Sequence, residues 1–115
     1  MGSGTGSGRT AMPRATRGSD GMLGWTLADL QKFTNRLSFT KGGNGEWTID
    51  HPAFGGGQIL EGTDIYNPTV KNYEVRVWNA DYEMEDTELF ASLNKAKDWI
   101  KWRMASNFDQ KKMNR

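Results

Sequence analysis

The chain has 115 residues, a formal net charge of +1 and 36% hydrophobic residues, which leaves room for one small domain. It contains no cysteine, so disulfide frameworks and thiolate metal sites are excluded. No apolar run approaches the roughly 18 residues of a membrane span, and no apolar signal-peptide core follows the charged residues near the N-terminus. We therefore expect a soluble, cytoplasmic protein without a membrane partner.

The first 21 residues consist largely of Gly, Ser, Thr and Arg and hold too little apolar surface to offset the entropy of ordering them. We predict a disordered tail over residues 1–21, a single domain over residues 22–108 and a frayed basic C-terminus over residues 109–115. The letters GSGTGSG resemble an artificial spacer, which favours an inert tail. The alternative is a native basic arm that contacts nucleic acid or an acidic partner.

Charge is segregated along the chain. Residues 46–88 hold ten carboxylates against two basic residues, whereas residues 92–115 hold seven basic residues against two carboxylates. Either the two regions partly neutralise each other within one fold, or they form a polarised surface that selects a partner.

The first predicted helix begins after Thr26. Thr26 is a good N-cap, and Asp29 follows it in the capping-box position. Apolar residues continue at helical spacing from Leu27 to Leu37, and the glycines at 42–43 end the helix.

The middle of the chain contains three or four predicted strands. Residues 46–50 alternate between apolar and polar, residues 58–66 form a weaker strand, and residues 71–79 give the clearest alternation. Residues 87–91 form a last strand, unless the following helix already begins at residue 86 or 87. The glycine run 55–57 is predicted to be a flexible loop.

Ser92 caps a second predicted helix, which continues to Phe108. Its apolar stripe consists of Leu93, Ala96, Ile100 and Met104. On the same helical wheel, Trp102 points away from this stripe and Trp99 lies near its border. An exposed tryptophan is unusual, which directs attention to this helix as a contact surface.

Short turns between successive strands imply antiparallel pairing, and two amphipathic helices have one sheet face to cover. We predict a small two-layer α+β sandwich with a sheet of three or four strands, in the order α-β-β-β-α. The opposite sheet face, bearing Glu74, Arg76 and Trp78, would be open to solvent or to a partner.

Catalytic and metal-binding patterns are lacking. His51 is the only histidine, and its neighbour Asp50 would point to the other face of a strand. The carboxylates of residues 83–88 lack EF-hand spacing, and the glycines of residues 55–57 are not followed by the Lys and Ser or Thr of a phosphate loop. We predict a protein that is not an enzyme and that has no cofactor and no metal.

The basic last helix allows three interpretations. Its tryptophans could stack on nucleic-acid bases, anchor a protein partner, or simply belong to the core. The element order and the basic last helix resemble those of double-stranded RNA-binding domains, which carry a lysine cluster where this chain has Lys95 and Lys97. Such a resemblance implies nucleic-acid binding, but the acidic sheet segment would repel a phosphate backbone.

The leading hypothesis is a small protein-binding module. Compact chains without cysteines or recognisable motifs are typical of phage and mobile-element accessory proteins that bind and modulate a host protein. Assigning this chain to that class rests on analogy. The alternative is a nucleic-acid-binding domain that uses the basic C-terminal helix and the Arg-containing tail, and a homo-oligomer is compatible with the first hypothesis. The candidate partner-binding residues are Trp102, Trp99, Lys95, Arg103, Trp78 and Arg76.

Overall fold

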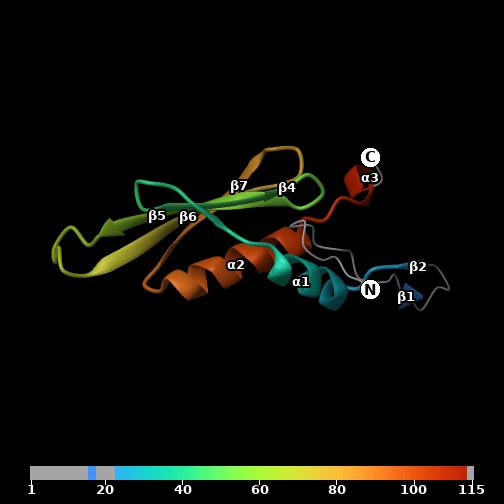
Figure 1. The fold of residues 1–115 in the computed structure, drawn as a ribbon, viewed down its shortest axis with the longest axis horizontal. Coiled ribbons are helices and arrows are strands. Elements are labelled where there is room, and N and C mark those ends of the chain that lie inside the picture. The colour runs from blue at the N-terminus through green and yellow to red at the C-terminus, as the bar shows by residue number, and fades with distance from the viewer. Residues whose placement is uncertain (1–15, 18–22, 114–115) are drawn as a thin grey trace.

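The structure, a computed structural model, describes residues 16–17 and 23–113, which form an α+β fold (Figure 1). The predicted disordered tail lies outside the described residues except for Thr16–Arg17. These two residues form strand β1, which pairs antiparallel with β2 at Leu23–Gly24.

Helix α1 spans Leu27–Arg36 and begins where the sequence predicts. The Asp29 amide donates to Thr26 Oγ1 at 3.2 Å, and the Thr26 amide donates to Asp29 Oδ2 at 3.1 Å, which completes the capping box. The helix ends earlier than predicted, because Leu37 adopts an extended conformation and leads the chain into a strand at Thr40–Lys41.

The sheet is a five-stranded antiparallel meander in which each strand pairs with the next one along the chain. Its strands are Thr40–Lys41 (β3), Glu46–His51 (β4), Gly55–Thr63 (β5), Lys71–Trp78 (β6) and Met84–Phe90 (β7). The predicted count of three or four strands is therefore wrong, and the order is α followed by five strands and α. The strand β3 is too short to show a periodic pattern, and β7 begins at Met84, before the strand predicted at residues 87–91, because it pairs with β6.

The glycines of residues 55–57 are not a flexible loop but the buried first residues of β5. At Gly55, φ is +74°, and a Cβ atom would lie 2.2 Å from the carbonyl oxygen of Trp78. At Gly57, a Cβ atom would lie 2.8 Å from Cγ2 of Ile100. The glycines thus allow a close approach between strands and between sheet and helix, a requirement that local composition does not reveal.

Helix α2 spans Leu93–Ser106 and is capped by Ser92, as predicted. Ala96, Ile100 and Met104 are fully buried, which confirms the predicted stripe. In Figure 1, α1 and α2 lie on the same side of the sheet, and α2 contacts β5, β6 and β7.

The chain continues past α2 into a short helix, α3, at Gln110–Met113, within the segment that we expected to fray. The Asp109 amide donates to the carbonyl of Ala53 at 2.7 Å, and Met113 packs against the core. The largest fully buried side chains are Phe33, Phe54, Ile59, Ile100, Met104, Val75, Val77 and Thr34. Among the described helices, none has the length and apolarity needed to cross a membrane.

Candidate functional site

One face of the sheet carries the helices, and the other face is open. The strand register places Leu60 opposite Glu74 and Trp78 opposite Met84, all on the side away from the buried Val75 and Val77. The open face therefore exposes apolar side chains that no element of the described chain covers with a second layer.

Four apolar side chains lie on this open face, at Leu60, Trp78, Met84 and Leu89. Met84 is 59% exposed and Leu89 is 61% exposed. A cleft of about 480 Å³ between β5, β6 and β7 is lined in part by Leu60 and Leu89. Leu60 and Leu89 lie beside Glu74 at this cleft, whereas Trp78 and Met84 form a second apolar pair four positions farther along β6. Exposed aliphatic groups and a tryptophan on an open face are typical of a protein interface.

The charged groups of the open face are mostly acidic. Arg76 Nη2 lies 3.7 Å from Glu74 Oε2, and Trp78 Nε1 donates to Asp50 Oδ1 at 3.4 Å. On the edge side, Gln58 Nε2 donates to a carboxylate oxygen of Glu46 at 3.2 Å. The fold therefore brings the predicted residues Trp78 and Arg76 together on a surface with three carboxylates and one guanidinium.

Two other candidate residues, Trp99 and Arg103, connect α2 to β7. The Arg103 guanidinium carbon lies 5.5 Å from the centre of the Trp99 ring, and its nitrogens lie 3.4 Å from Glu85 Oε1 and 3.7 Å from Asp86 Oδ2. The Trp99 ring packs against Phe90 with centres 5.6 Å apart. These side chains are engaged within the fold, and part of the acidic segment is neutralised by the basic helix.

Trp102 and Lys95 lie on the outward side of α2. Trp102 is 45% exposed, and Lys95 is also exposed. The helix thus carries two tryptophans in different surroundings, one joined to β7 and one facing solvent. The six candidate residues do not form one site, because Trp78 and Arg76 lie on the opposite side of the sheet from α2.

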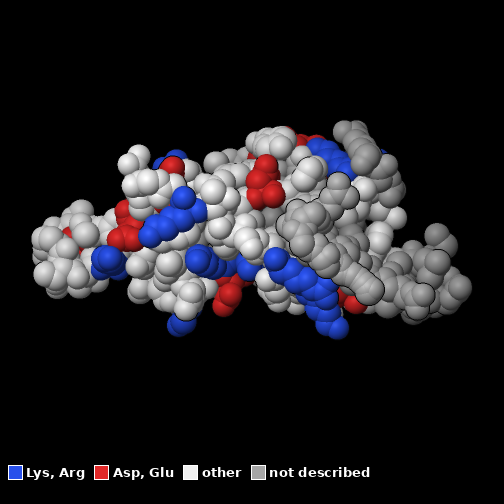
Figure 2. Space-filling model, in the orientation of Figure 1, with Lys and Arg blue, Asp and Glu red and all other residues white. Residues whose placement is uncertain are grey.

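A lysine cluster that is absent from these candidates forms around the Trp47 and Phe39 rings; we define it as Lys41 from β3 and Lys97 and Lys101 from α2. The Lys41 ammonium lies 5.4 Å from the centre of the Trp47 ring, and that of Lys97 lies 6.0 Å from the same ring. Lys97 and Lys101 also approach the Phe39 ring, at 5.6 and 5.8 Å. Figure 2 shows Lys and Arg side chains gathered in a band over the region of the helices.

The position of Lys101 within this cluster is fixed by a hydrogen bond. Its Nζ donates to the carbonyl of Asn35 at 3.0 Å, which ties α2 to the end of α1. Burial lowers the pKa of Lys101, and the positive charge of Lys97 adds to this effect, whereas Asp98 raises the pKa. At this position, Asp98 therefore offsets the positive charge of Lys97.

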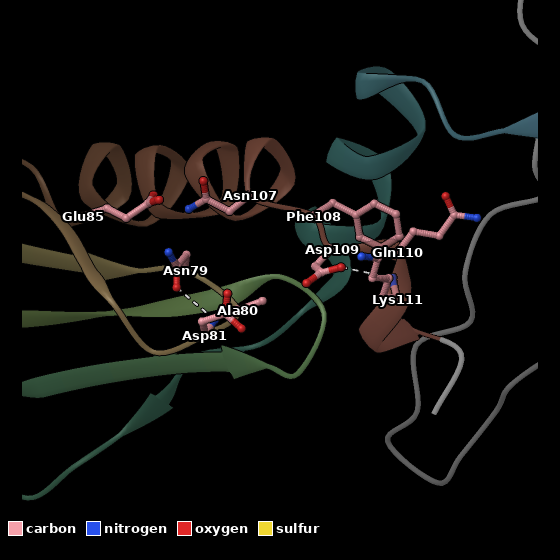
Figure 3. A pocket seen from close by; sticks show the side chains of 9 residues that line it. All are labelled: Asn79, Ala80, Asp81, Glu85, Asn107, Phe108, Asp109, Gln110 and Lys111. Atoms are coloured by element: carbon pink, nitrogen blue, oxygen red, sulfur yellow. Dashed lines mark hydrogen bonds between the residues drawn. The ribbon is translucent and has the colours of Figure 1, made fainter.

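A polar pocket of about 680 Å³ lies between the β6–β7 turn and the segment after α2 (Figure 3). Its acidic groups are already engaged: Asp81 pairs with Lys112, Glu85 pairs with Arg103, and Asp109 accepts from the Lys111 amide. Among the described residues, no group of three His, Cys, Asp or Glu side chains could hold a metal ion. The pocket offers shape and hydrogen-bonding groups, but its ionised groups are occupied by internal partners.

His51 and Asp50 point to opposite faces of β4, as the sequence predicts. His51 Nδ1 accepts a hydrogen bond from the Ala53 amide at 3.1 Å, and its ring packs against Phe33 and Phe54 at 5.3 and 5.2 Å. Burial lowers the pKa of His51, although the nearby Asp50 charge acts in the other direction. The arrangement holds a neutral imidazole that closes the β4–β5 turn.

Sequence patterns contained only part of the signal for these surfaces. Lys97 and Lys101 have the four-residue spacing that places side chains on one side of a helix. Lys41 comes from a two-residue strand with no pattern of its own, so only the tertiary structure joins it to the other two.

No protein-family model matches the chain, and comparisons with curated proteins and with solved structures found no match.

Proposed function

We propose that this protein is a small, non-enzymatic protein-binding module that uses the open face of its sheet around Trp78. The observation that carries the proposal is the open sheet face, on which Leu60 and Leu89 lie at a cleft and Trp78 and Met84 lie opposite each other at the end of β6, with no described element covering them. Burial of such side chains in a complex contributes through the hydrophobic effect, and a tryptophan near the centre is a typical anchor.

The charge of this face defines the chemistry of the partner. Glu46, Asp50 and Glu74 outnumber Arg76, so the surface favours a partner segment that combines apolar side chains with Lys or Arg. Charge complementarity would increase the association rate, while the apolar group around Trp78 would set the dissociation rate. A role as a phage or mobile-element accessory protein that modulates a host protein remains a proposal based on analogy in size and composition.

Site-specific photo-crosslinking tests this function in the cells that express the protein. A benzophenone amino acid at Leu89 should yield crosslinked protein partners, whereas the same group at Leu27, an exposed position on α1, serves as the matched control. Adding Trp78→Ala should remove the Leu89 adducts, since truncation of an anchor costs about 2 kcal/mol or more, close to thirtyfold in affinity.

The crosslinked species also separate the alternatives. Adducts with a second copy of the chain would identify a homo-oligomer, and light scattering of the purified protein would then show a mass above that of the monomer. Equal labelling from Leu27 and Leu89, or adducts that persist unchanged after Trp78→Ala, would contradict the proposal.

A further inference from the structure

The lysine cluster concentrates positive charge on the helix side of the sheet. Its three ammonium groups each lie within 6.0 Å of the centre of the Phe39 or Trp47 ring. Within residues 16–17 and 23–113, none of the three forms an ion pair. The aromatic rings orient the ammonium groups without neutralising them.

The many carboxylates of residues 46–88 do not neutralise this cluster either. The pleat of the sheet directs Glu46, Asp50 and Glu74 to the open face. On the helix side, Glu61, Glu85 and Asp86 already have internal cationic partners, and Glu88 is exposed. Three carboxylates of the acidic segment thus lie on the face away from the lysine cluster.

This separation changes the argument against nucleic-acid binding. The acidic sheet segment was expected to repel a phosphate backbone, but Glu46, Asp50 and Glu74 lie on the face away from the lysine cluster. A polyanion that approaches the cluster would meet three ammonium groups without ion-pair partners among the described residues, with Asp98 as a nearby carboxylate on α2.

We propose that the lysine cluster binds the phosphate backbone of a nucleic acid. The lysine ammonium is a compact point charge, which suits it to phosphate contacts that are independent of base sequence. The three lysines line neither of the two clefts, so the surface suits an extended polymer of repeated charges better than a single small anion. Because the cluster and the open sheet face lie on opposite sides of the sheet, the protein could hold a nucleic acid and a protein partner together.

The test is fluorescence anisotropy of labelled oligothymidylate and of a labelled DNA duplex, measured with the full chain at several salt concentrations. Three phosphate contacts predict that the logarithm of the binding constant falls with the logarithm of salt with a slope of about −2 for the single strand and about −3 for the duplex. At about 0.1 M salt, each lysine then contributes about fivefold to single-strand affinity.

The decisive variant is Lys97→Gln/Lys101→Gln, which should lose about 25-fold in single-strand affinity and flatten the salt dependence. The matched control, Lys32→Gln/Lys111→Gln, removes the same charge at two exposed positions outside the cluster and should bind nearly as the wild type does. Circular dichroism establishes that each variant is folded. If the decisive variant does not fold, Lys41→Gln, an exposed position on β3, should still lose about fivefold.

Several results would overturn the proposal. These are absence of binding at low salt, an equal loss in the control variant, and unchanged binding by the folded cluster variant. Polyglutamate that competes as well as oligothymidylate at equal charge concentration would instead identify an acidic protein as the ligand. Trp78→Ala should leave nucleic-acid binding unchanged, so failure at the open sheet face and failure at the lysine cluster are distinguishable.

Discussion

Gly57→Ala tests whether the glycine run is required by the packing of α2 on the sheet. The added Cβ atom would lie 2.8 Å from Ile100 Cγ2 and 3.0 Å from Ile100 Cδ1. Ile100 is fully buried, and a β-branched side chain in a helix has essentially one accessible χ1 rotamer, so it cannot move aside. Overpacking of this kind costs about 1–3 kcal/mol of unfolding free energy.

A double-mutant cycle separates this steric clash from other effects of the substitution. Ile100→Ala alone should destabilise by about 2–5 kcal/mol, because it leaves a cavity under α2. In Gly57→Ala/Ile100→Ala, both Ile100 atoms are absent and the new methyl group fills part of the cavity, whereas the contact with the Arg76 carbonyl oxygen at 3.0 Å remains. The combined loss should therefore be smaller than the sum of the single losses, by about 0.5–3 kcal/mol.

Urea unfolding followed by circular dichroism measures these free energies. Gly62→Ala is the matched control in the same strand, since its Cβ atom would meet only the end of the Asn72 side chain, at 3.1 Å. It should change stability by less than about 0.5 kcal/mol. If Ile100→Ala is unfolded, Ile100→Leu replaces it, because leucine also lacks the Cγ2 atom, with an expected cost of less than about 1.5 kcal/mol. Strict additivity, or an equal loss at Gly62, would refute the close-approach argument.

Three further predictions concern exposed and half-buried side chains. Trp102→Ala should change the unfolding free energy by less than about 0.5 kcal/mol and remove a red-shifted emission component, whereas early melting would show that the ring is core. Because burial lowers the folded-state pKa of His51, the unfolded chain takes up the proton first, so stability should fall as the pH falls through 6.5. His51→Asn keeps an acceptor for the Ala53 amide and should reduce this dependence in pH-resolved urea titrations; an unchanged pH dependence would exclude His51 as its source. Arg103→Lys should lower the free energy of unfolding by about 1 kcal/mol at low salt and by less at high salt, because one ammonium cannot replace the forked contacts to two carboxylates and the stacking on Trp99. Equal stability of the variant and the wild type would mean that these contacts contribute nothing.

Local sequence patterns predict the features that depend on near neighbours. The capping box at Thr26 and Asp29 locates the start of α1 because both partners lie within one helical turn. The stripe on α2 and the alternation of β6 repeat over enough residues to show which side chains are buried. Helix order, antiparallel strands and the open face around Trp78 follow from these local signals.

Tertiary structure alone decided the features that depend on distant partners. Composition favours a loop at residues 55–57, but the sheet and α2 require glycine there because only a residue without a side chain allows their close approach. Likewise, Arg103 approaches Asp86 only after the sheet has formed. The same holds for Lys41 and Lys97, which both approach the Trp47 ring. Periodicity describes which face a residue occupies on its own element, whereas the neighbours across elements, and hence the lysine cluster, are set by strand register and by helix packing.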